Sequence, residues 1–288
     1  MRHRVSTVTD SSCIQTINWT SFPHGTAIAL TVIRVCIRQH RHLDGVQHMN
    51  EQKKLGVIGG LGPMASAQFL ELLTSMTDAK RDQEHIEAIL YSRPQTPDRT
   101  AYLLGNSPES PLPVMLDSAR TLESLGCRVL VIPCMTAYSF AAEMQEKCTA
   151  QLVNPITQSA KLLKAAGKRC VGIMATDGTV KIGTFQKALR AEGIEPVTPD
   201  AENQREVMRI IYEDVKSGKP ADLEQFHAVA HSMRAKGAEC VILGCTELSV
   251  IKQTQQIGKG FLDAMEVLAA TAIAACGYSV KADIRLIG

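Results

Sequence analysis

The chain contains one local pattern twice: a helix that ends at a glycine, a short apolar run, and a cysteine followed closely by a threonine. The run and turn span residues 129–136 with Cys134 in the first copy, and residues 239–246 with Cys245 in the second. In both copies a glycine lies eight residues before the cysteine. Short runs rich in valine, isoleucine and leucine are typical of buried parallel strands. The duplication therefore predicts two related α/β halves, each with one cysteine at the carboxyl end of a strand.

A second matched pair of segments supports this interpretation. KKLGVIGGLGP begins at Lys53 and KRCVGIMATDGT begins at Lys168, and each predicts a strand that runs into a loop rich in glycine or threonine. In open α/β sheets, ligands bind beyond the carboxyl ends of the strands. We expect two pseudo-symmetric three-layer α/β domains with mostly parallel sheets and an active site in the cleft between them. The first domain is expected to comprise residues 53–156 plus 257–280, and the second residues 157–256.

The first 48 residues differ in composition from the rest of the chain. They hold five of the eight histidines, the only tryptophan, and neither lysine nor glutamate. The apolar stretch at residues 27–37 is interrupted by Arg34 and is too short to span a bilayer. A signal peptide or an organellar transit peptide is an alternative for this segment. We expect residues 1–48 to be a disordered or non-native leader, and the functional polypeptide to begin at Met49.

Composition and charge exclude several functional classes. The 288 residues carry a net charge of +2 with both signs interspersed, so the chain shows no basic stripe for DNA or RNA. The nine cysteines form neither CxxC pairs nor a Cys/His metal-ligand spacing. This usage favours a reduced, cytoplasmic protein over a disulfide framework. We therefore expect a small-molecule ligand, and no metal, nucleic acid or membrane as partner.

Two thiols that face one substrate have a defined chemistry. A thiolate is a competent base and a thiol a competent acid when the surroundings bring the pKa near neutrality. With one on each side of a carbon atom, a proton can be removed from one face and another returned to the opposite face. This exchange inverts a stereocentre. Cys134 and Cys245 are therefore the candidate catalytic residues.

The substrate of such a reaction also needs charge stabilisation. An α-proton beside an ionised carboxylate is very weakly acidic, and preorganised N–H groups, hydroxyls and cations are the usual means of stabilising the developing negative charge. Thr136 and Thr246, with the backbone amides beside each cysteine, are candidates to bind an α-carboxylate. The prolines in residues 93–100 predict a loop after a strand end. Arg99 in this loop and Lys216 near the end of a helix are candidates to bind a second, distal carboxylate. This set favours a dicarboxylic amino acid as the substrate.

Six segments, among them the two cysteine turns, carry a resemblance to a known family. They are GGLGPMA at 59–65, AKRDQEHI at 79–86, PQTPDRTAYLLG at 94–105, IPCMTAY at 132–138, MATDGT at 174–179 and LGCTELS at 243–249. Together they make the chain, from about residue 54 to 252, resemble the aspartate/glutamate racemase family, and within it the aspartate racemase branch. The resemblance implies a two-domain α/β enzyme, commonly a homodimer, that uses neither pyridoxal phosphate nor a metal.

The resemblance also implies roles for individual residues. Cys134 and Cys245 would be the two bases, Arg99 and Lys216 would bind the side-chain carboxylate, and the backbone of Leu61 would approach the substrate. We therefore predict an isomerase that interconverts L- and D-aspartate, with glutamate second, by two-base proton transfer at the α-carbon. Hydantoin racemases, maleate isomerases and decarboxylases of the wider superfamily use similar cysteines, but Arg99 and Lys216 favour a dicarboxylic amino acid.

The first cysteine motif departs from the family pattern. The family usually has Cys-Asn-Thr followed by Ala-His, whereas this chain has Met135 after the cysteine and Tyr138 in place of the histidine. A thioether lacks the hydrogen-bonding capacity of an amide, although the backbone N–H of Met135 is retained. The alternative hypothesis is therefore a substrate-shifted or non-catalytic family member that binds a small dicarboxylate.

A nicotinamide-dependent reductase is a minor alternative, because residues 60–65 match GxGxxA after a strand. Pro63 removes one N–H from that loop. The acidic residue expected about 20 residues later is missing, since the next strand ends at Ser92. Two interpretations of Glu247 are left open: it either braces the turn after Cys245 or takes part in the chemistry.

Overall fold

The computed structural model describes residues 52–282, 284 and 286–287 of the chain. The predicted leader, residues 1–48, and the predicted start at Met49 lie outside the described residues. Within the described part, none of the helices is both long enough and apolar enough to cross a membrane.

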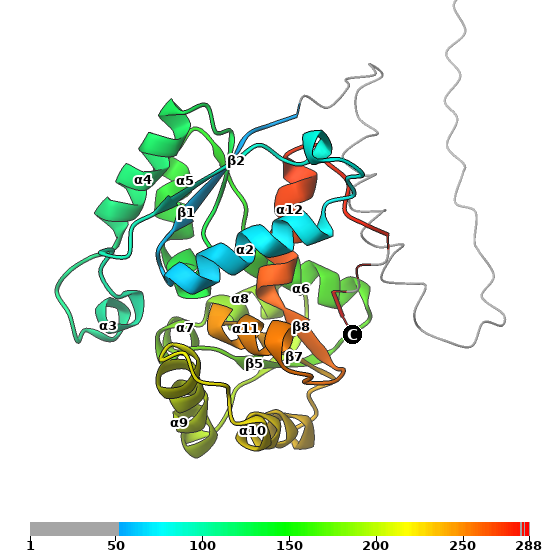
Figure 1. Ribbon diagram of the computed structural model, residues 1–288. Coiled ribbons are helices and arrows are strands. Elements are labelled where there is room, and N and C mark those ends of the chain that lie inside the picture. Colours follow the sequence, from blue (N-terminus) through cyan, green and yellow to red (C-terminus); the bar gives the residue numbers. More distant parts are fainter. Residues whose placement is uncertain (1–51, 283, 285, 288) are drawn as a thin grey trace, which may run out of the picture.

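Two sheets form the framework of the molecule (Figure 1). Each has four strands, and the strands follow the same relative order in both. The order is β2-β1-β3-β4 in the first sheet and β6-β5-β7-β8 in the second. All pairings between these strands are parallel. The strand bounds are β1 Leu55–Gly59, β2 Ala88–Ser92, β3 Val129–Val131, β4 Gln151–Leu152, β5 Cys170–Met174, β6 Glu195–Val197, β7 Cys240–Leu243 and β8 Phe261–Asp263. The predicted α/β class with two related parallel sheets is confirmed.

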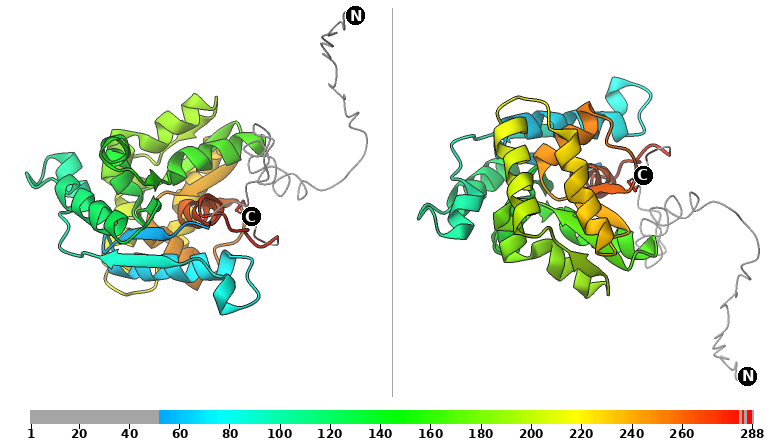
Figure 2. Two further views of the ribbon diagram at one scale, coloured as in Figure 1. Left: turned by 90° about the horizontal axis from the view of Figure 1, so that it is seen from above. Right: turned by 90° about the horizontal axis from the view of Figure 1, so that it is seen from below.

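Helices surround both sheets (Figures 1 and 2). The α-helices are α2 Pro63–Met76, α3 Arg99–Leu104, α4 Leu112–Ser124, α5 Ala141–Lys147, α6 Pro155–Ala165, α7 Asp177–Ile182, α8 Thr184–Ala191, α9 Ala201–Arg209, α10 Leu223–Ala235, α11 Thr246–Thr254 and α12 Ala264–Ala275. Two 3₁₀ helices, η1 Asp82–Glu84 and η2 Met135–Phe140, and a π-helix, η3 Ile210–Val215, complete the set.

The inner strands are covered by helices on both faces, which explains their continuous apolar sequence. Every residue of β1, β3 and β7 is buried. Gly56 of β1 faces α4, where an added Cβ would lie 3.1 Å from Leu122, and Gly59 faces α2, where it would lie 3.2 Å from the Cβ of Ser66. Because these glycines are three positions apart on a strand, they point to opposite faces. Helices α2 and α4 therefore sandwich the first sheet.

The last helix of each half crosses over to the other half. Helix α6 follows β4 of the first sheet and packs against α8, whereas α12 follows β8 of the second sheet and packs against α2 and β3. The two crossing helices also pack against each other. The prediction placed all of residues 257–280 in the first domain. This is wrong for β8, because β8 pairs with β7 in the second sheet. The other domain boundaries stay a prediction.

The buried core is continuous between the halves. One cluster of buried side chains joins Leu55 and Leu130 of the first sheet to Leu268 of α12 and to Phe185 of α8. A second cluster fills the space around α9 and α10 and includes Phe226. This shared core fixes the two sheets relative to each other, and with them the turns that follow β3 and β7.

Candidate active site

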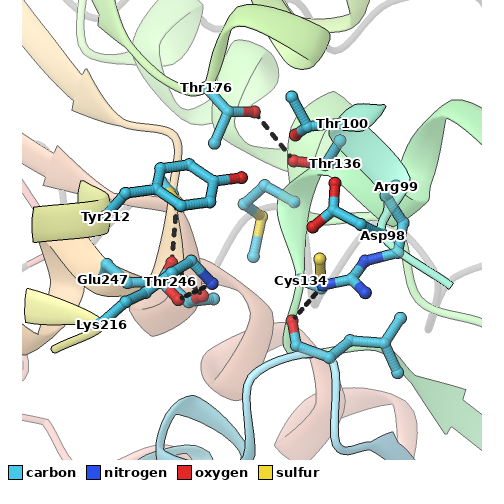
Figure 3. A pocket seen from close by; sticks show the side chains of 13 residues that line it. Asp98, Arg99, Thr100, Cys134, Thr136, Thr176, Tyr212, Lys216, Thr246 and Glu247 are labelled. Carbon is cyan, nitrogen blue, oxygen red and sulfur yellow. Dashed lines mark hydrogen bonds and ion pairs between the residues drawn. The ribbon is translucent and has the colours of Figure 1, made fainter. Parts of the chain in front are cut away.

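One pocket collects side chains from both halves of the molecule (Figure 3). Its lining includes all eight residues predicted as site residues: Leu61, Arg99, Cys134, Met135, Thr136, Lys216, Cys245 and Thr246. Five residues that were not among them complete the lining: Asp98, Thr100, Thr176, Tyr212 and Glu247.

The two cysteines occupy equivalent places in the two sheets. Cys134 directly precedes η2 in the turn after β3, and Cys245 directly precedes α11 in the turn after β7. Both strands hold the third place in their sheets. The cysteines are 7% and 6% exposed, so each thiol is largely removed from bulk water.

A buried tyrosine braces the turn that presents Cys134. The hydroxyl of Tyr138 accepts a hydrogen bond from the backbone N–H of Ile132 at 3.1 Å, and the carbonyl of Cys134 accepts one from the N–H of Ala137 at 3.1 Å. Burial raises the pKa of Tyr138, so its hydroxyl stays neutral. The residue that replaces the usual family histidine therefore has a structural partner in the turn.

Arg99 begins a helix, although residues 93–100 were expected to form a loop. The helix is α3, and Asp98 caps it: the Oδ1 atom of Asp98 accepts a hydrogen bond from the N–H of Ala101 at 2.7 Å. This contact follows the usual preference for aspartate before the first turn of a helix. The cap fixes the direction in which Arg99 leaves the backbone.

The guanidinium of Arg99 reaches the pocket with part of its bonding capacity unused. It donates to the backbone carbonyls of Pro97 and Leu61, each at 3.1 Å, while its buried Nε has no hydrogen-bond partner among the described residues. Burial lowers the pKa of Arg99, but negative charge at Cys134 and Asp98 outweighs this and leaves the pKa above its ordinary value. Arg99 is thus a permanent cation beside Cys134 that can bind an anion.

The loop after β1 places Leu61 against this arginine. Gly60 has φ 88°, a left-handed conformation, and an added Cβ would lie 2.4 Å from the backbone nitrogen of Arg93, so only glycine fits. The N–H of Gly60 donates to the Ser66 hydroxyl at 3.0 Å. Leu61 itself is buried, and its carbonyl accepts from Arg99. The backbone of this loop thus forms one wall of the pocket, beside the predicted carboxylate-binding group.

Cys245 is linked to a half-buried ion pair. The Oε2 atom of Glu247 accepts hydrogen bonds from the Cys245 thiol at 2.9 Å and from the Thr246 hydroxyl at 3.1 Å. The other carboxylate oxygen, Oε1, lies 2.7 Å from the ammonium of Lys216. That ammonium also lies 5.3 Å from the centre of the Tyr212 ring, over which it forms a cation–π contact.

These contacts set the protonation states of the group. Burial raises the pKa of the Cys245 thiol well above its ordinary value, and the Glu247 charge raises it further. Burial also opposes the charge of Glu247, but Lys216 outweighs it and lowers the pKa of that carboxyl. The Glu247 charge in turn raises the pKa of Lys216 despite burial. The group therefore consists of a protonated thiol, a carboxylate and an ammonium.

The contacts of Glu247 and Lys216 bear on the roles that the sequence predicted for these two residues. Both interpretations of Glu247 stay open, because its contact to the Thr246 hydroxyl braces the turn and its contact to the Cys245 thiol suits a part in the chemistry. Its signal in the sequence was its place two residues after the cysteine, in the first turn of α11. Lys216 was predicted to bind a substrate carboxylate. It lines the pocket, but within the described chain its ammonium already pairs with Glu247.

Three threonine hydroxyls connect the two halves by hydrogen bonds, and two of them, those of Thr136 and Thr176, line the pocket. Thr136 and Thr176 lie 3.0 Å apart between their hydroxyl oxygens, Thr176 and Thr179 lie 3.1 Å apart, and Thr179 donates to Thr136 at 3.0 Å. Thr176 also caps α7 by accepting from the Thr179 N–H. The predicted role of Thr136 did not include these partners, which lie 40 and 43 positions away in the sequence.

The arrangement suits acid–base chemistry. Cys245 is a thiol held by a carboxylate, while Cys134 lies near a cation, so the two walls carry an acid and a candidate base. Among the residues that the structure describes, no group of three His, Cys, Asp or Glu side chains is placed to hold a metal ion.

Known proteins with a similar sequence or fold include amino-acid racemases. The family model described as Asp/Glu/Hydantoin racemase matches residues 58–272. The structure is similar to that of an aspartate racemase from Picrophilus torridus, with a TM-score of 0.69 and 34% identity over 80% of this chain and 96% of that one. A broad-specificity amino-acid racemase from Bacillus subtilis is 21% identical over 76% of this chain and 96% of its own length. The glutamate racemase of Francisella tularensis, solved with D-glutamate, shares the fold, with a TM-score of 0.58 and 17% identity over 79% and 81%.

Proposed function

The chain belongs to the Asp/Glu/hydantoin racemase family, and on that premise we propose that it interconverts L- and D-aspartate, with glutamate as a second substrate. The reaction proceeds without pyridoxal phosphate or metal, by proton exchange between the α-carbon and two thiols. The observation that carries the proposal is the pocket in which Cys134 and Cys245, one from each half, meet an arginine with an unused N–H. The 34% identity to the Picrophilus torridus aspartate racemase supports aspartate as the preferred substrate.

The first step removes the α-proton of the substrate. Cys134, as a thiolate, takes the proton from one face, and the electron pair of the C–H bond moves into the α-carboxylate. Donors beside the cysteines stabilise the added charge: the backbone N–H groups of Met135, Thr136 and Thr246. Arg99 holds the side-chain carboxylate of the substrate and so orients the α-carbon between the thiols.

The second step returns a proton to the opposite face. The Cys245 thiol donates it and becomes a thiolate, while Cys134 is left as a thiol. Lys216 stabilises that new thiolate, since its charge lowers the pKa of Cys245. The same steps in reverse order convert the other enantiomer. Burial, and after it the charge of Glu247, raise the pKa of Cys245 and so make the thiol its resting form.

A second candidate is a family member with a shifted substrate preference, or one that binds a small dicarboxylate without turning it over. Met135 is 2% exposed and lines the pocket, so a thioether occupies the position at which the family usually has an amide. The broad specificity of the Bacillus subtilis relative is compatible with an altered preference. This candidate differs from the first in the substrate accepted and not in the position of the site.

Incubation of metal-free, pyridoxal-free protein with L-aspartate in deuterium oxide tests the first candidate. Loss of the α-proton is followed by NMR and the chirality of the product by chromatography. Deuterated D-aspartate is the expected product. If neither aspartate nor glutamate exchanges while other amino acids do, the substrate is shifted. If no amino acid exchanges but dicarboxylates bind, the protein is a binding protein.

We further propose that the enzyme acts in the cytoplasm as a homodimer. All cysteines of the described residues are free thiols, which suits a reducing compartment. Analytical ultracentrifugation at micromolar concentration tests the assembly, and a monomer throughout would contradict it.

A further inference from the structure

The substrate proposed above carries one group without a named partner, its α-ammonium. A cation that leaves water for a largely buried pocket requires an anionic partner or carbonyl groups. Two carboxylates line the pocket, Asp98 from the first half and Glu247 from the second. They differ in how much of their bonding capacity the protein already uses.

Glu247 is fully engaged. One of its oxygens pairs with Lys216 at 2.7 Å, and the other accepts from the Cys245 thiol and the Thr246 hydroxyl. Its side chain is 8% exposed, so it has little open surface for a further partner. A substrate ammonium at Glu247 would have to displace Lys216 or the thiol that serves as the acid.

Asp98 has capacity left. Its Oδ1 accepts one hydrogen bond, from Ala101, whereas an ionised carboxylate offers about four acceptor sites. No ion pair among the described residues includes Asp98. The residue is exposed, lines the pocket, and lies beside Arg99 in Figure 3.

We propose that Asp98 binds the α-ammonium of the substrate; this inference rests on the proposed function. Asp98 and Arg99 are consecutive, so one short segment presents an anion beside a cation and matches a zwitterionic amino acid at both its ammonium and its side-chain carboxylate. This pairing fixes the orientation of the α-carbon. An ammonium kept protonated by Asp98 also withdraws electrons from the α-carbon and so favours loss of the α-proton. The substrate class is then an acidic α-amino acid, and not a plain dicarboxylate.

The contribution of Asp98 to folding can be separated from its contribution to binding. Asparagine caps helices as well as aspartate does, so Asp98→Asn keeps the cap of α3 and removes the charge. Asp200→Asn is the matched control. Asp200 caps α9 in the same manner, accepting from the N–H of Asn203 at 3.0 Å, and does not line the pocket.

Isothermal titration calorimetry with two ligands tests the inference on the intact protein. Racemic aspartate undergoes no net conversion during the titration, and succinate is the same dicarboxylate without the ammonium. Asp98→Asn should weaken the binding of racemic aspartate by about tenfold or more, as expected for loss of one charged hydrogen bond. It should leave succinate binding unchanged or tighten it, because a negative charge has been removed. Asp200→Asn should change neither.

Equal weakening of both ligands, or no weakening of aspartate, would overturn the inference. Racemisation is measured separately, so the two proposals can fail independently. Wild-type protein that selects aspartate over succinate through Asp98 but catalyses no exchange would contradict the reaction and support the ammonium site. Protein that racemises aspartate, but in which Asp98→Asn leaves the selection of aspartate over succinate intact, would support the reaction and contradict the ammonium site. Wild-type protein that binds neither ligand would contradict both.

Discussion

Replacing Glu247 by glutamine should change how strongly Cys245 holds its proton. The substitution is nearly isosteric and removes the charge that pairs with Lys216 at 2.7 Å and accepts the Cys245 thiol at 2.9 Å. In the native site, burial has the largest effect on the pKa of Cys245 and raises it. The charge of Glu247 raises this pKa further, whereas the charge of Lys216 lowers it. Without the carboxylate, the opposing effect of Lys216 remains. The pKa of Cys245 in the Glu247→Gln variant should therefore fall.

The pH profile of kcat/KM reports this change, because it follows ionisations of the free enzyme. The active form holds one proton between two thiols, and activity is lost at high pH when that last proton leaves the pair. Cys245, with its raised pKa, is expected to hold it. Glu247→Gln should therefore shift the high-pH limb to lower pH. Since the enantiomers have equal free energies, the limb must shift equally for L-to-D and D-to-L conversion.

The same substitution also has a calculable effect on stability. Removing one partner of a fully buried ion pair costs about 3–5 kcal/mol. The Lys216 side chain is 30% exposed, and the glutamine amide oxygen still accepts a hydrogen bond, so a cost of about 1–2 kcal/mol is expected. For a chain of this size, such a loss lowers the Tm by roughly 2–8 °C, which differential scanning calorimetry resolves.

Glu266→Gln is the matched control for the Glu247 variant. Glu266 pairs with Lys252 at 2.7 Å, with side chains 13% and 21% exposed, and lies outside the pocket. The control should leave the pH profile of kcat/KM unchanged whatever its effect on the Tm. A high-pH limb that stays in place in Glu247→Gln, or that moves equally in both variants, would refute the assigned role of Glu247.

Three further substitutions test other parts of the site. Met135→Asn restores the amide usual in the family and should raise kcat/KM for aspartate by about two- to tenfold, the effect of one hydrogen bond. The rate is measured by chiral chromatography, and no gain would argue against Met135 as the cause of any altered preference. Tyr138→Phe leaves the buried N–H of Ile132 without its acceptor and should lower the free energy of unfolding in urea by about 1–3 kcal/mol. An unchanged free energy of unfolding would contradict the bracing role of Tyr138. Arg99→Lys keeps the charge but loses the planar fork and should raise the KM for aspartate by about tenfold, whereas an unchanged KM would remove Arg99 from the substrate site.

The fold was predictable because the chain repeats itself. Two matched pairs of strand and loop segments, and apolar runs too continuous for exposed strands, indicated parallel sheets covered on both faces. The place of β8 was not predictable in the same way. It is a strand of three residues, Phe261–Asp263, and nothing local in so short a segment decides which sheet it joins. That choice depends on pairing with β7, which only the assembled second sheet provides.

The candidate site was predictable where strand ends or family motifs marked it, and all eight predicted residues line one pocket. Asp98 was not among them, because the prolines around it indicated a loop. An aspartate followed by RTAYLL is nevertheless a helix-start signal, which the structure bears out as the cap of α3. Thr176 and Tyr212 reach the pocket only because the halves pack together, and local sequence does not encode such contacts. The catalytic and binding roles remain predictions.

The central claim is that each half contributes one base, and deuterium exchange by single-cysteine variants tests it most directly. Cys134→Ser and Cys245→Ser are each incubated with L-aspartate and with D-aspartate in deuterium oxide, and α-deuteration and chirality are followed. Neither variant should racemise, and each should exchange the α-proton of one enantiomer only, with the two variants selecting opposite enantiomers. Full racemisation by either variant, or exchange of the same enantiomer by both, would contradict a mechanism with one base from each half.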